Sequence, residues 1–204
     1  METGIEFMID YKILADSERF YAEHGKFVRV DVPWTVSEEI CNITKPIGAK
    51  CYRICDHKNG KVLVASAEQS FLYQYAKGYL PKGRFQAITP CFRFETHDQF
   101  HQKSFIKNEL IITDYVDRVH LDIMVSHAQS FFESKLEDAV SIVETSSNSM
   151  DIEYKGVELG SYGIRHCEFL SWIYGTGVAE PRFSTVMRNK KFLAEKYELS
   201  FKKD

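Results

Sequence analysis

The spacing of apolar residues predicts helices near both ends of the chain and in its middle. Residues 9–24 place apolar side chains three and four positions apart, which is typical of an amphipathic helix, and Gly25 follows as its C-terminal cap. The same spacing recurs over residues 67–80 and residues 127–147. The chain closes with another helical pattern from Glu180 to Tyr197.

Alternation of apolar and polar residues predicts strands between these helices. In residues 26–34, Val28, Val30 and Val32 fall on one face of a strand, and Pro33 ends it because proline cannot donate to a sheet ladder.

Further strand-like segments occupy the rest of the chain: residues 49–66, 83–95, 104–116, 150–164 and 167–177. The first of them is a predicted hairpin, because it is centred on Asn59-Gly60, a strong signal for a two-residue turn. Helices that flank a mostly antiparallel sheet make an α+β domain. With 204 residues and no repeat or low-complexity linker, residues 1–204 are expected to form one domain.

Composition and charge narrow the class of protein. A net charge of −3 offers no overall attraction for a polyanion such as a nucleic acid. No run approaches the length of apolar residues that spans a bilayer, and the N-terminus carries acids where a signal peptide carries basic residues. A cytoplasmic protein without a membrane segment is expected.

Cysteine usage fits a reducing compartment, since five cysteines are an odd number and too few for a disulfide scaffold. Cys51 and Cys55 raise the question of a zinc site. Their spacing differs from the usual two-residue knuckle and no second pair follows, so buried free thiols are favoured over zinc.

Arg93 and Glu95 lie two positions apart in an apolar strand-like stretch, so they project to one side of the strand. Ionised side chains there need water, a partner or a ligand. A salt bridge at a strand edge would explain an isolated pair of this kind. The surrounding motifs change that interpretation.

Four short motifs occur in one order along the chain: Ser66-Ala67-Glu68; Cys91-Phe92-Arg93-Phe94-Glu95 followed by Phe105-Ile106-Lys107-Asn108-Glu109; Glu158-Leu159-Gly160-Ser161; and the segment from Gly175-Thr176-Gly177 to Arg182. With them the chain resembles the catalytic domain of class II aminoacyl-tRNA synthetases, most closely the seryl type. The resemblance covers nearly the whole chain and implies that family's antiparallel sheet flanked by helices.

The resemblance implies ATP-dependent activation of an amino acid to an aminoacyl adenylate, with release of pyrophosphate. Its implied ATP site comprises Arg93, Glu95, Phe105, Glu158, Ser161, Gly175, Gly177 and Arg182. In these roles Arg93 would bridge the α-phosphate and the substrate carboxylate, and Arg182 would hold the γ-phosphate. Phe105 would stack on adenine, Glu95 would accept from its amino group, and Glu158 with Ser161 would take Mg²⁺. The two glycines would leave room for the nucleotide over the strand.

The amino-acid site implied by the resemblance comprises Ser66, Glu68, Arg93, Glu109, Trp172 and Tyr174. Glu68 and Glu109 would receive the α-ammonium group. Seryl enzymes carry T-L-N before the third motif, whereas this chain has Trp172-Ile173-Tyr174, so serine is not expected to be preferred. The indole and phenol rings either line a pocket for another side chain or fill it.

The chain of 204 residues is expected to have no anticodon-binding domain or tRNA-binding arm, and its mildly acidic charge agrees with this. The acceptor of the activated group is therefore expected to be something other than tRNA, such as a small molecule, a carrier protein or a peptide. Two alternatives stay open: a binding paralogue without catalysis, and an aminoacyl-tRNA ligase that borrows tRNA-binding parts from a partner chain. The resemblance also implies a homodimer through the first helix and strand. Such pairing would cover the apolar face of the first helix, unless that face packs on its own domain.

Overall fold

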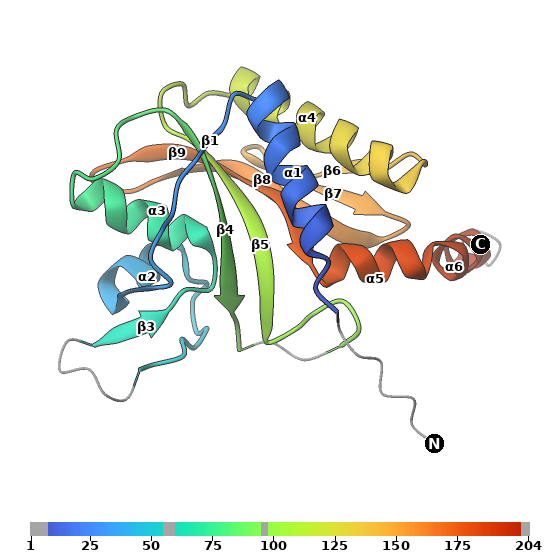
Figure 1. Cartoon of the computed structure of the whole chain (residues 1–204), viewed down its shortest axis with the longest axis horizontal. Helices are drawn as coiled ribbons and strands as arrows, with labels where there is room; N and C mark the ends of the chain where they lie inside the picture. Colours follow the sequence, from blue (N-terminus) through green and yellow to red (C-terminus); the bar gives the residue numbers. More distant parts are fainter. Residues whose placement is uncertain (1–7, 55–59, 95–97, 201–204) are drawn as a thin grey trace.

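The computed structural model describes residues 8–54, 60–94 and 98–200. Six helices lie along this part of the chain: α1 (Tyr11–His24), α2 (Glu38–Thr44), α3 (Ala67–Ala76), α4 (Arg118–Leu136), α5 (Arg182–Arg188) and α6 (Lys190–Ser200). Nine strands accompany them in the described residues: β1 (Val28–Arg29), β2 (Thr35–Ser37), β3 (Lys61–Leu63), β4 (Arg84–Phe92), β5 (Ser104–Ile112), β6 (Ser141–Ser146), β7 (Ser149–Tyr154), β8 (Val157–His166) and β9 (Ser171–Glu180). Figure 1 shows their arrangement.

Seven of the strands form one sheet in the order β1-β4-β5-β9-β8-β7-β6. Every neighbouring pair is antiparallel except β1 with β4. The remaining strands, β2 and β3, form a small antiparallel ladder. This architecture confirms the predicted α+β class, in which helices flank a mostly antiparallel sheet.

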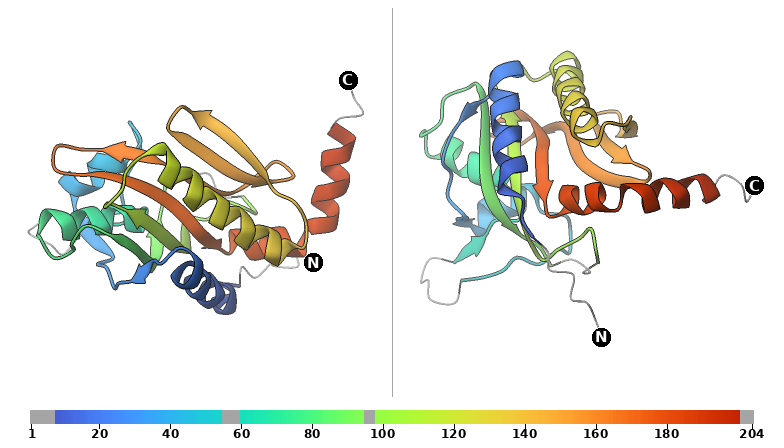
Figure 2. Two further views of the ribbon diagram at one scale, coloured as in Figure 1. Left: turned by 90° about the horizontal axis from the view of Figure 1, so that it is seen from above. Right: turned by 45° about the vertical axis from the view of Figure 1, so that its right-hand side comes forward.

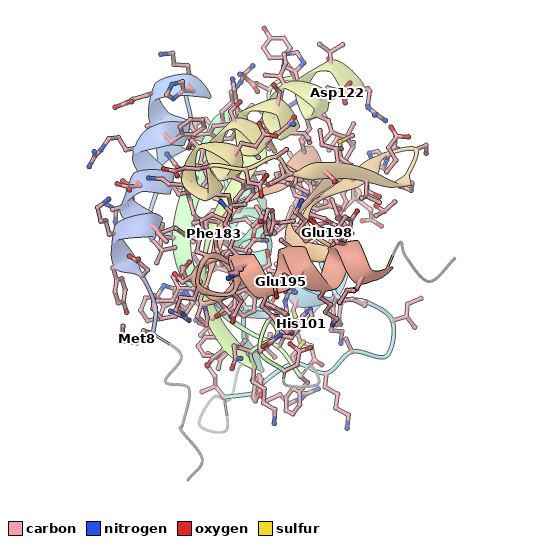
Figure 3. The ribbon with its side chains drawn as sticks, turned by 90° about the vertical axis from the view of Figure 1, so that its right-hand side faces the viewer. Met8, His101, Asp122, Phe183, Glu195 and Glu198 are labelled. Carbon is pink, nitrogen blue, oxygen red and sulfur yellow. The ribbon has the colours of Figure 1, made fainter. Side chains whose placement is uncertain are left out.

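Helices α1 and α4 cover one face of the large sheet (Figure 2). Their buried side chains, among them Leu14, Tyr21, Phe131 and Phe132, share a core with apolar residues of the central strands. Figure 3 looks onto α5 and α6, with Phe183 of α5 close to α4; the Phe183 ring lies 5.2 Å from that of Phe132. This core fixes the sheet from one side and leaves the other face for the site.

The opposite face carries α2, α3 and the small ladder at one end of the sheet. Here Phe71 and Leu72 of α3 pack with Val36, Val62 and Trp172 in a second buried cluster. The two clusters lie on opposite faces because side chains alternate along each strand. The rest of this second face is where polar and charged side chains gather.

The helix predicted for residues 127–147 is wrong in its second half. Helix α4 ends at Leu136, Glu137 takes a left-handed backbone with φ 51°, and β6 follows. Ile142, Val143 and Thr145 lie in this strand, where β-branched side chains fit the pleated backbone better than a helix.

The single C-terminal helix predicted from Glu180 to Tyr197 is also wrong. Glu180 ends β9, and two helices meet at Asn189, whose side-chain amide donates to the carbonyl oxygen of Thr185 at 2.8 Å. A side chain that bonds to the backbone in this way competes with helix continuation.

Two predicted strands are shorter than expected. The segment at residues 26–34 keeps only β1, and Val28 is exposed while Val32 is buried in the second cluster. In the predicted hairpin β3 pairs with β2, and the first arm is reduced to a single bridge from Arg53 to Val62. Asn59 of its turn lies outside the described residues.

The apolar face of α1 packs on its own domain. Ile13, Leu14 and Tyr21 are buried against the sheet and α4, and the Tyr21 hydroxyl donates to the carbonyl oxygen of Gly177 at 3.1 Å. A dimer is therefore not needed to cover this face.

No helix within the described ranges has the length and apolar character that a bilayer-spanning helix requires.

An ion-pair cluster ties α1 to α4. The Asp16 carboxylate accepts from Lys12 Nζ at 2.8 Å and from Lys135 Nζ at 2.7 Å. These two hydrogen bonds lower the pKa of Asp16 from 3.8 to about 2. Because the folded state favours the ionised carboxyl, this stability is present above pH 3.8 and is lost as the pH falls towards 2.

We predict that Asp16→Asn lowers the free energy of unfolding at pH 7 by roughly 0.2–1 kcal/mol, the usual range for ion pairs near the surface. The difference from wild type should shrink between pH 3.8 and pH 2, because wild-type Asp16 is then also neutralised. Urea titrations at several pH values measure it. Glu23→Gln, an exposed acid on the same helix, is the control. A deficit of unchanged size at pH 2 would contradict the assignment.

Candidate active site

A cavity of about 330 Å³ lies on the second face of the sheet. Its walls come from β5, β8, β9, the start of α3, the start of α5 and the loop after α2. Nine of the residues proposed from the sequence line it: Ser66, Glu68, Arg93, Phe105, Glu109, Glu158, Ser161, Tyr174 and Arg182. Segments far apart in the sequence therefore meet at one hollow.

Arg93 and Arg182 both line this cavity, and they follow the ends of β4 and β9, which lie at the same end of the sheet because both strands run antiparallel to β5. Arg93 directly follows β4; its Nε donates to the carbonyl oxygen of Ala65 at 3.0 Å, and its guanidinium carbon lies 5.1 Å from the centre of the Phe105 ring. Arg182 is the first residue of α5, and its Nη1 donates to Glu158 Oε1 at 2.8 Å. The two guanidinium groups are thus fixed on the walls of one pocket.

Strand β5 supplies the middle of the cavity floor through strict alternation. Phe105, Lys107 and Glu109 line the cavity, while Leu110 belongs to the core beneath α1 and α4. Lys107 Nζ donates to Glu109 Oε1 at 2.9 Å, and both side chains are almost fully buried. Each of these buried charges needs the other as a partner, because either charge alone would be costly to desolvate.

The start of α3 brings Ser66 and Glu68 to the same floor. Ser66 is the N-cap: its hydroxyl oxygen accepts from the backbone N–H of Glu68 at 3.2 Å and its O–H donates to Glu109 Oε2 at 2.5 Å. The cap thus both begins the helix and holds a carboxylate of β5 in place.

Glu68 is a buried carboxylate with two strong donors. Trp172 Nε1 donates to its Oε1 at 2.7 Å, and Arg165 Nη1 donates to its Oε2 at 2.6 Å. Burial raises the pKa of Glu68, opposed by the positive charge of Arg165 and reinforced by the negative charge of Glu109. The two carboxylates proposed for the substrate ammonium are therefore close, and each already has a cationic partner.

Trp172 does not line the cavity, although it was proposed for the amino-acid site. Its side chain is fully buried in the second cluster, beneath Glu68. Tyr174, two residues further along β9, does line it. Of the two alternatives left open by the sequence, the indole therefore fills space while the phenol lines the pocket.

Glu158 and Ser161 of β8 present oxygen atoms to the cavity, beside Asp151 of β7. Burial raises the pKa of Asp151, and the negative charge of Glu158 raises it further. A hydrogen bond with Ser161 lowers this pKa and so opposes both effects. Carboxylates and a hydroxyl suit a hard cation such as Mg²⁺, which prefers oxygen and keeps much of its water. Among the described residues no group of three or more metal-binding side chains forms a dedicated cage.

Gly175 and Gly177 face the other side of β9. A Cβ atom at Gly175 would lie 2.4 Å from Met124 Sδ and 2.8 Å from Tyr162 Cδ1, and one at Gly177 would lie 3.0 Å from a carbon of the Tyr21 ring. Their lack of a side chain makes room for core residues, and the steric role expected beneath a nucleotide is not the one seen here. At this point of β9 the cavity is lined by Thr176.

Two of the remaining proposals concern residues outside the described part of the chain. Glu95 lies outside the described residues, so its proposed role stays a prediction. Cys55 does too, while Cys41 and Cys51 are free thiols with their sulfur atoms 2.9 Å apart. Burial, and to a smaller extent the hydrogen bond with Cys51, raises the pKa of Cys41 to about 12. This thiol is therefore protonated at neutral pH.

Sequence reasoning missed cationic side chains of the cavity, among them Lys107 of β5 and Arg165 of β8. Both could have been found from the period of a strand. Lys107 falls midway between Phe105 and Glu109, and Arg165 lies four positions after Ser161, on the same face. Without the structure, nothing in the sequence pairs Arg165 with Glu68, whose hydrogen bond joins β8 to α3.

Known structures share the fold of this chain. A crystal structure of the cytoplasmic serine-tRNA ligase of Naegleria fowleri in complex with AMP superposes with a TM-score of 0.67 at 16% identity, over 85% of this chain and 47% of that one. The pyrrolysyl-tRNA synthetase of Desulfitobacterium hafniense gives a TM-score of 0.69 at 14% identity, over 88% of this chain and 69% of that one. No family model matches the sequence, and no curated protein matches it either.

These similarities confirm that the chain has the fold of a class II aminoacyl-tRNA synthetase catalytic domain. The chain spans about half the length of the Naegleria ligase chain, at 47%. At such low identity the likeness carries the fold alone, and the assignment of chemistry depends on the cavity.

We predict that Gly175→Ala lowers the free energy of unfolding by about 1–3 kcal/mol, because the added methyl group would overpack the contact with Met124 and Tyr162. Urea denaturation measures the change. Ser171→Ala, at an exposed position of the same strand, should stay within about 0.5 kcal/mol of wild type. Equal stability of Gly175→Ala and wild type would contradict the packing role.

Proposed function

We propose that this protein activates an amino acid with ATP, forming an aminoacyl adenylate and releasing pyrophosphate. The observation that supports this most is the position of Arg93 and Arg182 on one cavity of about 330 Å³, with Phe105 between the strands that carry them. Two guanidinium groups on one pocket suit a polyphosphate, since each offers a planar pair of donors to phosphate oxygens.

In the reaction, an oxygen of the substrate carboxylate attacks the α-phosphorus of ATP. The bond from that phosphorus to the bridging oxygen of the β-phosphate breaks, and pyrophosphate leaves. Negative charge concentrates on the α-phosphate oxygens in the transition state, so a fixed cation there lowers the barrier without covalent catalysis. Arg93 would take this role, since it lines the cavity and its Nε donates to the carbonyl oxygen of Ala65.

Arg182 takes the γ-phosphate of a bent ATP in this proposal. Glu158 accepts from its Nη1 at 2.8 Å and would orient the guanidinium before ATP arrives. Glu158 and Ser161 would also hold Mg²⁺, which supplies charge neutralisation at the phosphates when bound. Adenine would stack on Phe105; because the Arg93 guanidinium lies over that ring, binding on this face requires Arg93 to shift towards the α-phosphate.

The amino acid would bind beside Ser66, Glu68 and Glu109, with its carboxylate directed at Arg93 and its ammonium at the two glutamates. Each carboxylate oxygen has two lone pairs, so oxygens that already accept from Lys107 or Arg165 can accept again. A neutral analogue without the ammonium would leave part of this acceptor set unused.

The acceptor of the aminoacyl group is, in this proposal, a small molecule, a carrier protein or a peptide in the cytoplasm. The formal charge of −3 gives no general affinity for a tRNA backbone. Charging of tRNA by the isolated protein would replace this proposal with aminoacyl-tRNA ligation.

We predict that the wild-type protein exchanges labelled pyrophosphate into ATP with at least one amino acid, and that Arg93→Lys or Arg182→Lys lowers the exchange rate by about 100-fold or more. Lysine keeps the charge and loses the two-point contact. Arg188→Lys, at an exposed position of the same helix as Arg182, is the matched control and should exchange like wild type. Absence of exchange with every amino acid, where calorimetry shows bound ATP, favours a non-catalytic binding paralogue.

We also propose a homodimer through α1 and β1, on the strength of the family resemblance. Strand β1 lies at one edge of the large sheet, and its residue Val28 is exposed. Sedimentation equilibrium is expected to give twice the chain mass of 23.7 kDa, and Val28→Lys should shift the equilibrium towards the monomer. A wild-type protein that sediments as a monomer at micromolar concentration would contradict the proposal.

A further inference from the structure

Arg165 lines the cavity, and the proposed reaction assigns it no task. It lies on β8, on the same face as Ser161, and its side chain is 39% exposed. Its guanidinium carbon lies 4.1 Å from the centre of the Tyr174 ring on the neighbouring strand β9 (Figure 1). An arginine stacked on an aromatic ring at the wall of a pocket is held flat and presents its edge to whatever enters.

A second contact fixes the direction of this edge. Arg165 Nη1 donates to Glu68 Oε2 at 2.6 Å, and Glu68 is held in turn by Trp172 Nε1 at 2.7 Å. These two hydrogen bonds link Trp172, Glu68 and Arg165 in a series that begins in the buried second cluster and ends at the cavity. Trp172 and Tyr174, which stand where seryl enzymes carry polar residues, are the two side chains that build this support.

Most of the hydrogen-bonding capacity of Arg165 is unused. A guanidinium has five N–H donors. Within residues 8–54, 60–94 and 98–200, the only acceptor bonded to Arg165 is Glu68, through Nη1. Arg165 lines the cavity, and a planar pair of oxygens such as a carboxylate matches the spacing of its remaining donors.

The charges that line the cavity favour the same kind of ligand. Among the described residues of its lining, six side chains are cationic (Lys45, Lys50, Arg93, Lys107, Arg165 and Arg182) and four carry carboxyl groups (Glu68, Glu109, Glu158 and Glu180). Glu68 and Glu109 already pair with Arg165 and Lys107. An acidic side chain on the substrate would therefore enter a site with more cationic than acidic groups, which lowers the cost of burying its charge.

We propose that Arg165 determines specificity by binding a carboxylate on the side chain of the substrate, so that the amino acid activated is an acidic one such as aspartate or glutamate. This inference rests on the proposed function, since it assumes that an amino acid occupies the cavity. It goes further in naming the substrate class and the residue that selects it.

Calorimetric titration of the full chain, with and without AMP, tests this with two isosteric pairs: L-aspartate against L-asparagine and L-glutamate against L-glutamine. Each pair differs mainly in side-chain charge. At least one acid should bind about 10- to 100-fold more tightly than its amide, the range expected for hydrogen bonds to a charged group. O-phospho-L-serine is a third arm, and tighter binding of this compound than of both acids would overturn the assignment to a carboxylate.

Arg165→Gln should remove the preference for the acid while leaving AMP affinity unchanged, which also shows that the cavity is intact. Arg165→Lys should keep part of the preference, because it retains the charge and loses the fork. Arg29→Gln, on the exposed edge strand β1, is the control for removing an arginine and should behave as wild type. Equal binding of acids and amides by wild type, no binding of any amino acid, or an undiminished preference in Arg165→Gln would each overturn the inference.

Pyrophosphate exchange in the same preparations separates this inference from the proposed function. Exchange with a neutral amino acid that Arg165→Gln leaves unaltered supports adenylation and overturns the acidic substrate. Selective binding of an acid without exchange supports the specificity of Arg165 and removes the catalytic proposal.

Discussion

Charged side chains that are buried on one face of a sheet need partners of opposite charge, and this constraint organises the site. Lys107 pairs with Glu109, Arg165 with Glu68, and Arg182 with Glu158. Each of these pairs joins side chains on or beside the central strands. Three ion pairs thus line the cavity, into which a triphosphate and an amino acid would bring their own charges.

The opposite face of the same strands explains how these charges are held in place. Helices α1 and α4 pack a large apolar cluster beneath the sheet. Gly175 and Gly177 permit close approach of Met124 and Tyr21 there, which keeps β9 tightly packed against the helices. The alternation of strand side chains then presents Tyr174 and Thr176 to the cavity. The precision of the site therefore comes from the core on the far side of the sheet.

Much of this could be predicted from the sequence, because strand alternation and motif order are local signals. The α+β class and the meeting of Arg93 with Arg182 on one cavity followed from them. The failures have physical causes. The strand β6 was predicted as helix because the helical spacing of apolar residues in α4 continues into its β-branched residues. The break between α5 and α6 was missed because it involves a hydrogen bond from the Asn189 side chain, which the pattern of apolar and polar residues does not indicate. The hydrogen bonds of Glu68 with Trp172 and Arg165 could not be predicted, because they join segments that are far apart in the sequence.

In the proposed reaction the guanidinium groups of Arg93 and Arg182 bind different phosphates of one nucleotide. Calorimetry of ATP and AMP binding to Arg93→Lys and Arg182→Lys measures this. We expect Arg182→Lys to weaken binding of ATP but not of AMP, since only ATP has a γ-phosphate, and Arg93→Lys to weaken both. Wild-type affinity for ATP in both variants would contradict it.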